Sequence, residues 1–123
     1  MKLFNLSIFT VLSLTSSTAH ADCFTTGYVG VPSLAYNQIE KICGEDLAGN
    51  LAINLSKGKC LPLQSFHYDF TIYNLKKGQN SLSVGDCVAY MKKQIACSRG
   101  GDTSYSNIGW RFVADPNAGD CLH

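Results

Sequence analysis

The residues best suited to binding chemistry form a row of polar side chains along residues 66–74. Polar and apolar residues alternate there, which is the pattern of a half-buried strand. The apolar set is Phe66, Tyr68, Phe70 and Ile72, and the polar set is His67, Asp69, Thr71 and Tyr73. If the apolar set packs inward, the polar set points outward, and Arg111 can join it from a neighbouring strand.

This mixture of side chains suits a sugar. In carbohydrate sites an aromatic ring stacks on the C–H face of the sugar, while carboxylate and guanidinium groups hydrogen-bond its hydroxyls. We therefore predict a carbohydrate-binding site at His67, Asp69, Tyr73 and Arg111. The competing interpretation is an ordinary solvated strand face, which also carries mixed polar residues.

The sequence contains none of the common motifs of catalysis. It has no G-x-S-x-G elbow, P-loop, dinucleotide fingerprint or H-E-x-x-H helix. The enzymatic alternative is a small secreted ribonuclease, because residue types for acid–base cleavage of RNA are present. They are His67, His123, Glu40 or Glu45, and Arg99 or Arg111. Their spacing matches no ribonuclease pattern, so we predict that the protein is not an enzyme.

The chain begins with the features of a secretory signal peptide. Lys2 precedes an apolar run over residues 3–14, and Ala19-His20-Ala21 is an A-x-A cleavage site. The apolar run is shorter than the roughly 20 residues that span a bilayer, so we expect no membrane insertion. We predict a leader over residues 1–21 and one secreted, extracellular domain over residues 22–123.

The charge of the exported part argues against polyanionic partners. Removing the leader takes away Lys2, so nine basic residues face nine acidic ones and the net charge is zero. A protein without a positive field has little attraction for nucleic acid or anionic membranes. Charge itself therefore indicates no partner; the prediction of a glycan or glycoprotein rests on the polar row along residues 66–74.

The cysteines indicate a disulfide framework. All six lie in the exported part: Cys23, Cys43, Cys60, Cys87, Cys97 and Cys121. A secreted route favours three disulfides, and the absence of a Cys-x-x-Cys pair argues against a metal site; no cofactor is indicated. Ten residues of helix span about 15 Å, whereas a disulfide needs Cα atoms within about 7 Å. Cys87 and Cys97 therefore should not pair with each other, and the remaining connectivity is open.

Local patterns predict an α+β domain. A first helix is expected from Pro32 to residue 42 or 43, with Gly44 as its stop, and the pattern allows a short helical turn over residues 45–48 after it. A second helix is expected from residue 84 after a Ser83 cap, with an apolar stripe of Val84, Cys87, Val88, Met91 and Ile95. Strands are expected over residues 51–55, 66–74 and 108–114, with a weak one over 22–30. Residues 56–59, 102–107 and 115–117 are expected as turns or loops. This order predicts an antiparallel sheet of about four strands packed with two main helices.

One further motif lies on the expected strand over residues 51–55. Asn54-Leu55-Ser56 is an N-glycosylation sequon in a chain with an export signal. Sequons within strands are often left unmodified, so the occupancy of Asn54 is left open.

The carboxy-terminal part resembles a known family. The residues that carry the resemblance are Cys97-Ser98-Arg99-Gly100-Gly101, Trp110-Arg111-Phe112, Ala114-Asp115-Pro116-Asn117, Gly119 and Cys121. They are similar to those of small secreted fungal proteins that include a glycan-binding lectin of an ink-cap mushroom. The similarity extends back to Cys23 and includes the Ile-Cys-Gly ending of the first helix.

This resemblance implies a compact, disulfide-bonded α/β sandwich that acts outside the cell. It implies glycan binding as the activity and allows a homodimer. Because a family can keep its scaffold while the ligand changes, a secreted effector or toxin-like interaction protein is the alternative function.

Overall fold

The computed structural model describes residues 21–122, so the expected leader, apart from its last residue, and His123 lie outside the described residues. The elements follow in the order α2 (Pro32–Ile42), η2 (Cys43–Leu47), β1 (Gly49–Leu51), β2 (Ser56–Pro62), β3 (Phe66–Asn74), β4 (Asn80–Leu82), α3 (Val84–Ile95), β5 (Gly101–Tyr105) and β6 (Trp110–Ala118). The main sheet has the order β2-β3-β6-β5, and β1 pairs with β4 in a small second sheet. All strand pairs are antiparallel, so the predicted α+β class is confirmed.

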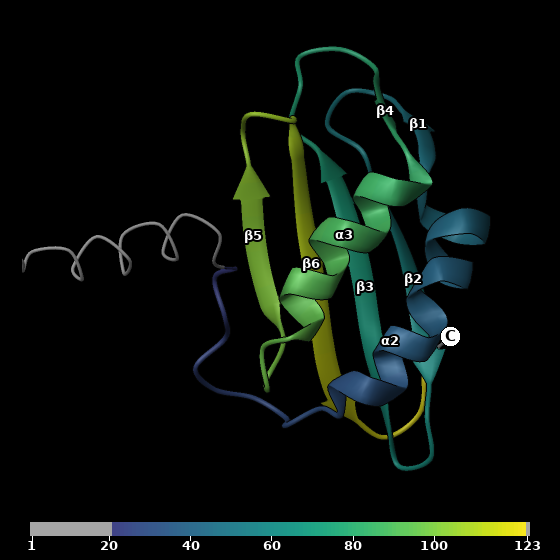
Figure 1. Ribbon diagram of the computed structural model, residues 1–123, viewed down its shortest axis with the longest axis vertical. Coiled ribbons are helices and arrows are strands. Elements are labelled where there is room, and N and C mark those ends of the chain that lie inside the picture. Colours follow the sequence, from purple (N-terminus) through teal and green to yellow (C-terminus); the bar gives the residue numbers. More distant parts are fainter. Residues whose placement is uncertain (1–20, 123) are drawn as a thin grey trace, which may run out of the picture.

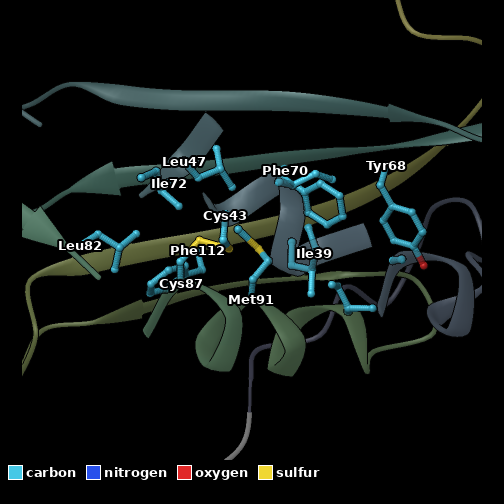
Figure 2. Packing of buried hydrophobic residues seen from close by; sticks show 14 of the residues in the cluster. Ile39, Cys43, Leu47, Tyr68, Phe70, Ile72, Leu82, Cys87, Met91 and Phe112 are labelled. Carbon is cyan, nitrogen blue, oxygen red and sulfur yellow. A yellow bond between two sulfur atoms is a disulfide. The ribbon is translucent and has the colours of Figure 1, made fainter. Parts of the chain in front are cut away.

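Both helices lie on the same face of the main sheet, and the hydrophobic core fills the space between them (Figures 1 and 2). Phe70 and Ile72 of β3 and Phe112 of β6 point toward the helices, where Ile39 and Met91 meet them. Each of these side chains is almost fully buried. The period-two pattern of the strands and the helical spacing of the apolar residues therefore produce a two-layer domain with one covered sheet face.

Three disulfides connect segments that are distant in the sequence. Cys43 pairs with Cys87 in the core between the two helices, Cys23 pairs with Cys97, and Cys60 pairs with Cys121. As the length of α3 requires, Cys87 and Cys97 have different partners. The first turn of α3 is thus attached to Cys43 at the start of η2, and the residues just after α3 are attached to the amino-terminal segment.

The helix boundaries follow mostly from local sequence. The hydroxyl of Ser83 accepts a hydrogen bond from the Asp86 N–H at 3.0 Å, which caps α3 as predicted. The first helix ends at Ile42, within the expected bounds, and the helical turn expected after it is the π-helical η2, which begins directly at Cys43 and runs through Gly44 to Leu47. Val84, expected in the apolar stripe of α3, is 45% exposed because it lies in the first turn, beyond the edge of the core.

Two expected assignments around residues 51–59 are wrong. Residues 52–55 form a turn and β1 ends at Leu51, whereas the expected turn at 56–59 belongs to β2. The alternating Leu51, Ile53 and Leu55 imitate a strand, yet Ile53 and Leu55 are 44% and 52% exposed. The expected weak strand at residues 22–30 is reduced to a single bridge between Cys23 and Gly101.

Two other expected loops are strands. Residues 101–105 form β5, and β6 continues through Asp115, Pro116 and Asn117 to Ala118. A proline is tolerated there because the β5 pairing ends at Ala114, so β6 beyond that point has an open edge on that side. Pairing with β3 on the other side keeps the segment extended, and Pro116 is buried opposite Tyr68.

Candidate functional site

The candidate site is the face of the main sheet opposite the two helices, called the open face below. Residues that pair directly across antiparallel strands share a face. The register pairs Tyr73 with Arg111, and His67 and Asp69 share the face of Tyr73 because they alternate with it along β3. All four residues predicted from the sequence therefore lie on this face. Its other members, from β2, β3, β6 and β5, are Ser56, Gly58, Cys60, Pro62, Thr71, Val113, Asp115, Asn117, Asp102 and Ser104.

His67 is more enclosed than an outward-facing strand residue was expected to be. The side chain is buried, because the segment after β6 passes beside it and the Cys60–Cys121 disulfide holds that segment in place. Its Nδ1 lies 2.8 Å from the carbonyl oxygen of Gly119, and its Nε2 lies 3.1 Å from Oδ2 of Asp69. The ring therefore connects the carboxy-terminal segment to the open face.

Both ring nitrogens of His67 face oxygen acceptors, which favours the doubly protonated ring. The hydrogen bond to Gly119 raises the pKa of His67 above its ordinary value of 6.5, burial lowers it, and the Asp69 carboxylate raises it further. The net effect is a raised pKa. The charged ring is the form that satisfies both contacts at once.

Stability should consequently fall as the pH rises through neutrality. The pKa of His67 is higher in the folded chain than in the unfolded one, so its stabilising contribution is complete below pH 6.5 and disappears as the pH passes the folded pKa. We expect the urea midpoint of the wild type to decrease as the pH rises above 6.5, and this slope to vanish in His67→Gln. An equal slope in the variant would assign the titration to another group.

The Asp69 carboxylate is held in a fixed orientation at the surface. Its Oδ2 accepts hydrogen bonds from His67 and, at 3.0 Å, from Nδ2 of Asn117. The side chain is 47% exposed. Because Oδ2 carries both contacts, Oδ1 is the oxygen left available to an incoming hydroxyl or amide group.

An open groove of about 520 Å³ lies beside this carboxylate. It is lined by Gly58, Lys59, Cys60, Asp69, Phe70, Thr71 and Leu122. Gly58 lies opposite Thr71 in the register, and the missing side chain leaves room above the sheet at that point. The groove combines a carboxylate and a hydroxyl with the apolar surface of Leu122, which is a suitable lining for one face of a sugar ring.

Tyr73 and Arg111 form a separate, tightly bonded group at the other end of the open face. The Arg111 guanidinium donates to both carboxylate oxygens of Asp102, at 2.7 and 2.6 Å, and its Cζ lies 4.4 Å from the centre of the Tyr73 ring. The hydrogen bonds to Asp102 raise the pKa of Arg111. This group ties β3, β6 and β5 together, so its main role in the free protein is to stiffen the face.

Comparison with known protein families matches residues 36–121 to Glycan binding domain Y3. The chain belongs to this family. No curated protein matches the chain. Membership establishes a glycan-binding type of domain, in agreement with the resemblance noted from the carboxy-terminal residues. The match begins within α2 and covers every later element, and therefore the whole of the open face.

One cluster in this Y3-type domain has the residue types of a metal site. Ligand atoms of Cys60, His67 and Asp69 lie within 4.8 Å of one another. The sulfur of Cys60 is bonded to Cys121, however, and is not available as a thiolate. The proximity is accounted for by the disulfide that holds the carboxy-terminal segment over His67.

Among the described residues, no helix is long and apolar enough to cross a membrane.

Three residues of the candidate site were not recognised in the sequence. Asn117 was assigned to a turn and Asp102 to a loop, whereas both lie on the open face and bond with predicted site residues. The signal for Asn117 was present, because extending the alternation of β6 past Pro116 places it on the same face as Arg111. Gly58 gave no signal, since a glycine in a Lys-Gly-Lys segment more often marks a turn.

Proposed function

We propose that this protein is a secreted lectin that binds glycans without catalysis in the groove on the open face. The observation that carries the proposal is the Asp69 carboxylate, oriented by His67 and Asn117 at the side of that groove in a glycan-binding family. A prealigned acceptor binds a sugar hydroxyl without the entropy cost of ordering a free side chain. The three disulfides and the signal-like leader support export to an oxidising compartment.

The proposed contacts follow from the lining of the groove. Oδ1 of Asp69 accepts from one sugar hydroxyl, and the hydroxyl of Thr71 can donate to or accept from another. The exposed side chain of Leu122 offers an apolar surface for the C–H groups of the ring. Tyr73 and Arg111, at the other end of the open face, provide further polar contacts for a longer glycan, with Arg111 using the N–H groups that Asp102 leaves free.

The absence of catalysis belongs to the same proposal. Asp69 and Asp115 are register partners on the open face, and paired carboxylates are also the machinery of glycosidases. In this chain Asp69 is committed to His67 and Asn117 through Oδ2, an arrangement that favours a hydrogen-bond acceptor over a proton donor. We therefore expect bound glycans to be recovered intact after incubation, which mass spectrometry of the glycan can check.

A glycan array with the folded, disulfide-bonded protein tests the binding proposal. Asp69→Ala should lower the affinity for the best glycan by about 10- to 100-fold, because hydrogen bonds to a charged group contribute roughly 1.5–3 kcal/mol. Gly58→Leu should have a comparable effect by filling the groove while leaving the Asp69 contacts in place. Ser104→Ala, on the same face in β5, is the matched control and should bind like the wild type.

The variants also separate loss of the site from loss of the fold. Far-ultraviolet circular dichroism and the melting temperature should report a folded protein for each variant before affinity is compared. A wild-type protein that binds no glycan, or Gly58→Leu and Asp69→Ala proteins that both bind normally, would contradict the proposed site.

A further inference from the structure

The turn between β1 and β2 presents an asparagine that the proposed lectin site does not use. The N–H of Leu55 donates to the carbonyl oxygen of Ala52 at 3.3 Å, which closes the turn. Asn54 has a φ of +61°, a left-handed conformation that asparagine adopts more readily than most residues. The structure thereby moves Asn54 from the expected strand to the tip of an exposed turn.

We propose that Asn54 is N-glycosylated during export of the protein. Asn54-Leu55-Ser56 is the one sequon within residues 22–123, and Asn54, Leu55 and Ser56 are all exposed. The sequence pattern placed this sequon in a strand, where the paired backbone disfavours modification. In the turn, the side-chain amide is accessible and the folded domain can accommodate a bulky oligosaccharide. The proposal rests on the secretion included in the proposed function.

The chemistry requires a donor from the export pathway, which we take to be an oligosaccharide linked to a lipid diphosphate. The side-chain nitrogen of Asn54 forms a bond to the anomeric carbon of the first sugar. The bond from that carbon to the diphosphate oxygen breaks, and the lipid diphosphate leaves with the electron pair. The amide nitrogen loses one proton to a base of the transferase. No oxidation or reduction takes place.

The surroundings of the turn fit an attached glycan in two ways. The buried Asn74 holds the turn from below, because its Nδ2 donates to the carbonyl oxygens of Leu51 and Ala52 at 3.0 and 3.1 Å. The tip is thus fixed in place although it is exposed. Ile53 and Leu55, on either side of Asn54, are 44% and 52% exposed, and an attached sugar would cover part of this apolar surface.

The position also leaves the proposed lectin groove free. The turn lies just before the start of β2, near the β1–β4 pair (Figure 1). The groove lies alongside Gly58 and Cys60 in the middle of that strand. A glycan that projects from Asn54 away from the sheet does not need to cross the groove. Glycosylation and glycan binding are therefore separable, and each can fail without the other.

Translation of the full chain in the presence of microsomes tests the proposal directly. We expect a protease-protected product that is larger than the unmodified polypeptide of residues 22–123. Treatment with a peptide N-glycosidase should return the product to the mass of that polypeptide. A peptide spanning residue 54 should carry the modification. Ser56→Ala, which leaves Asn54 and its turn conformation in place, and Asn54→Gln should both be protected but unmodified, whereas Ser56→Thr should remain modified.

The outcomes distinguish this proposal from the others. A protected wild-type product with the mass of the bare polypeptide overturns glycosylation while supporting export. A product that remains sensitive to protease overturns both, since the modification requires entry into the export pathway. Glycan binding by unmodified, refolded protein is measured separately and does not depend on either result.

Discussion

Replacing both Cys43 and Cys87 with alanine is expected to lower the free energy of unfolding by at least about 4 kcal/mol. The disulfide closes a segment with a sequence separation of 44, and loss of that constraint on the unfolded chain accounts for the figure. Both cysteines are fully buried where α2 ends and α3 begins, so removal of the sulfurs also leaves a cavity in the core. A loss of this size is a large part of the total stability of a small domain.

The Cys60–Cys121 disulfide provides the matched comparison. It has the longer sequence separation, 61, so chain entropy alone predicts a larger loss for Cys60→Ala with Cys121→Ala. Both of its cysteines are only half-buried, however, and we expect the Cys43 and Cys87 double variant to be the less stable one. Urea unfolding without reductant measures the difference. The opposite order would show that chain entropy outweighs core packing here.

The second large effect is expected for Gly100→Ala. Gly100 has a φ of +79°, where an alanine costs roughly 1–2 kcal/mol. A Cβ at this position would also overlap the backbone carbonyl of Ala114 and lie 2.6 Å from Cδ of Pro116. Neither of these groups can move without disturbing β6. We therefore expect a loss of about 3 kcal/mol or more in the free energy of unfolding.

Gly119→Ala separates the two causes. Gly119 has a similar φ of +83°, but a Cβ there would meet no atom within 4 Å. Only the backbone cost applies, so the expected loss is about 1–2 kcal/mol. Thermal unfolding of both variants beside the wild type gives the comparison. If the two substitutions lower the free energy of unfolding equally, the contact of an added Cβ at residue 100 with β6 has no measurable cost.

Of the two disulfides, the one between Cys60 and Cys121 also supports the candidate site. The Cys60–Cys121 disulfide keeps Gly119 beside His67, and His67 orients Asp69. Loss of that disulfide should therefore weaken glycan binding as well as stability. Loss of the Cys43–Cys87 disulfide should affect binding only through unfolding, because it lies on the far side of the sheet.

Local sequence patterns were sufficient for the elements whose physical causes are local. The alternation over residues 66–74 gives β3 with the bounds that the structure shows, because the covered face demands an apolar residue at every second position. Ser83 marks the start of α3 since its hydroxyl satisfies a free N–H of the first turn. Met91 of the expected apolar stripe is buried, and the length of α3 excludes pairing of Cys87 with Cys97.

The errors occur where distant segments decide the conformation. Residues 115–117 have the composition of a turn, but pairing with β3 keeps them extended. Residues 51–55 have the alternation of a strand, but the chain must bend between the small sheet and β2, and Asn74 from β3 fixes the bend. Composition and periodicity describe a segment by itself, so they cannot register these contacts.

The sequence alone therefore determined the α+β class, the disulfide-bonded character and the polar face of β3 that carries the candidate site. Only the tertiary structure decided how that face works. It brings Asn117 to Asp69 across 48 residues and Gly119 to His67 across 52, and it leaves a groove above Gly58. The physical reason is that an oriented carboxylate depends on partners that strand pairing places beside it, and strand pairing joins residues far apart in the chain.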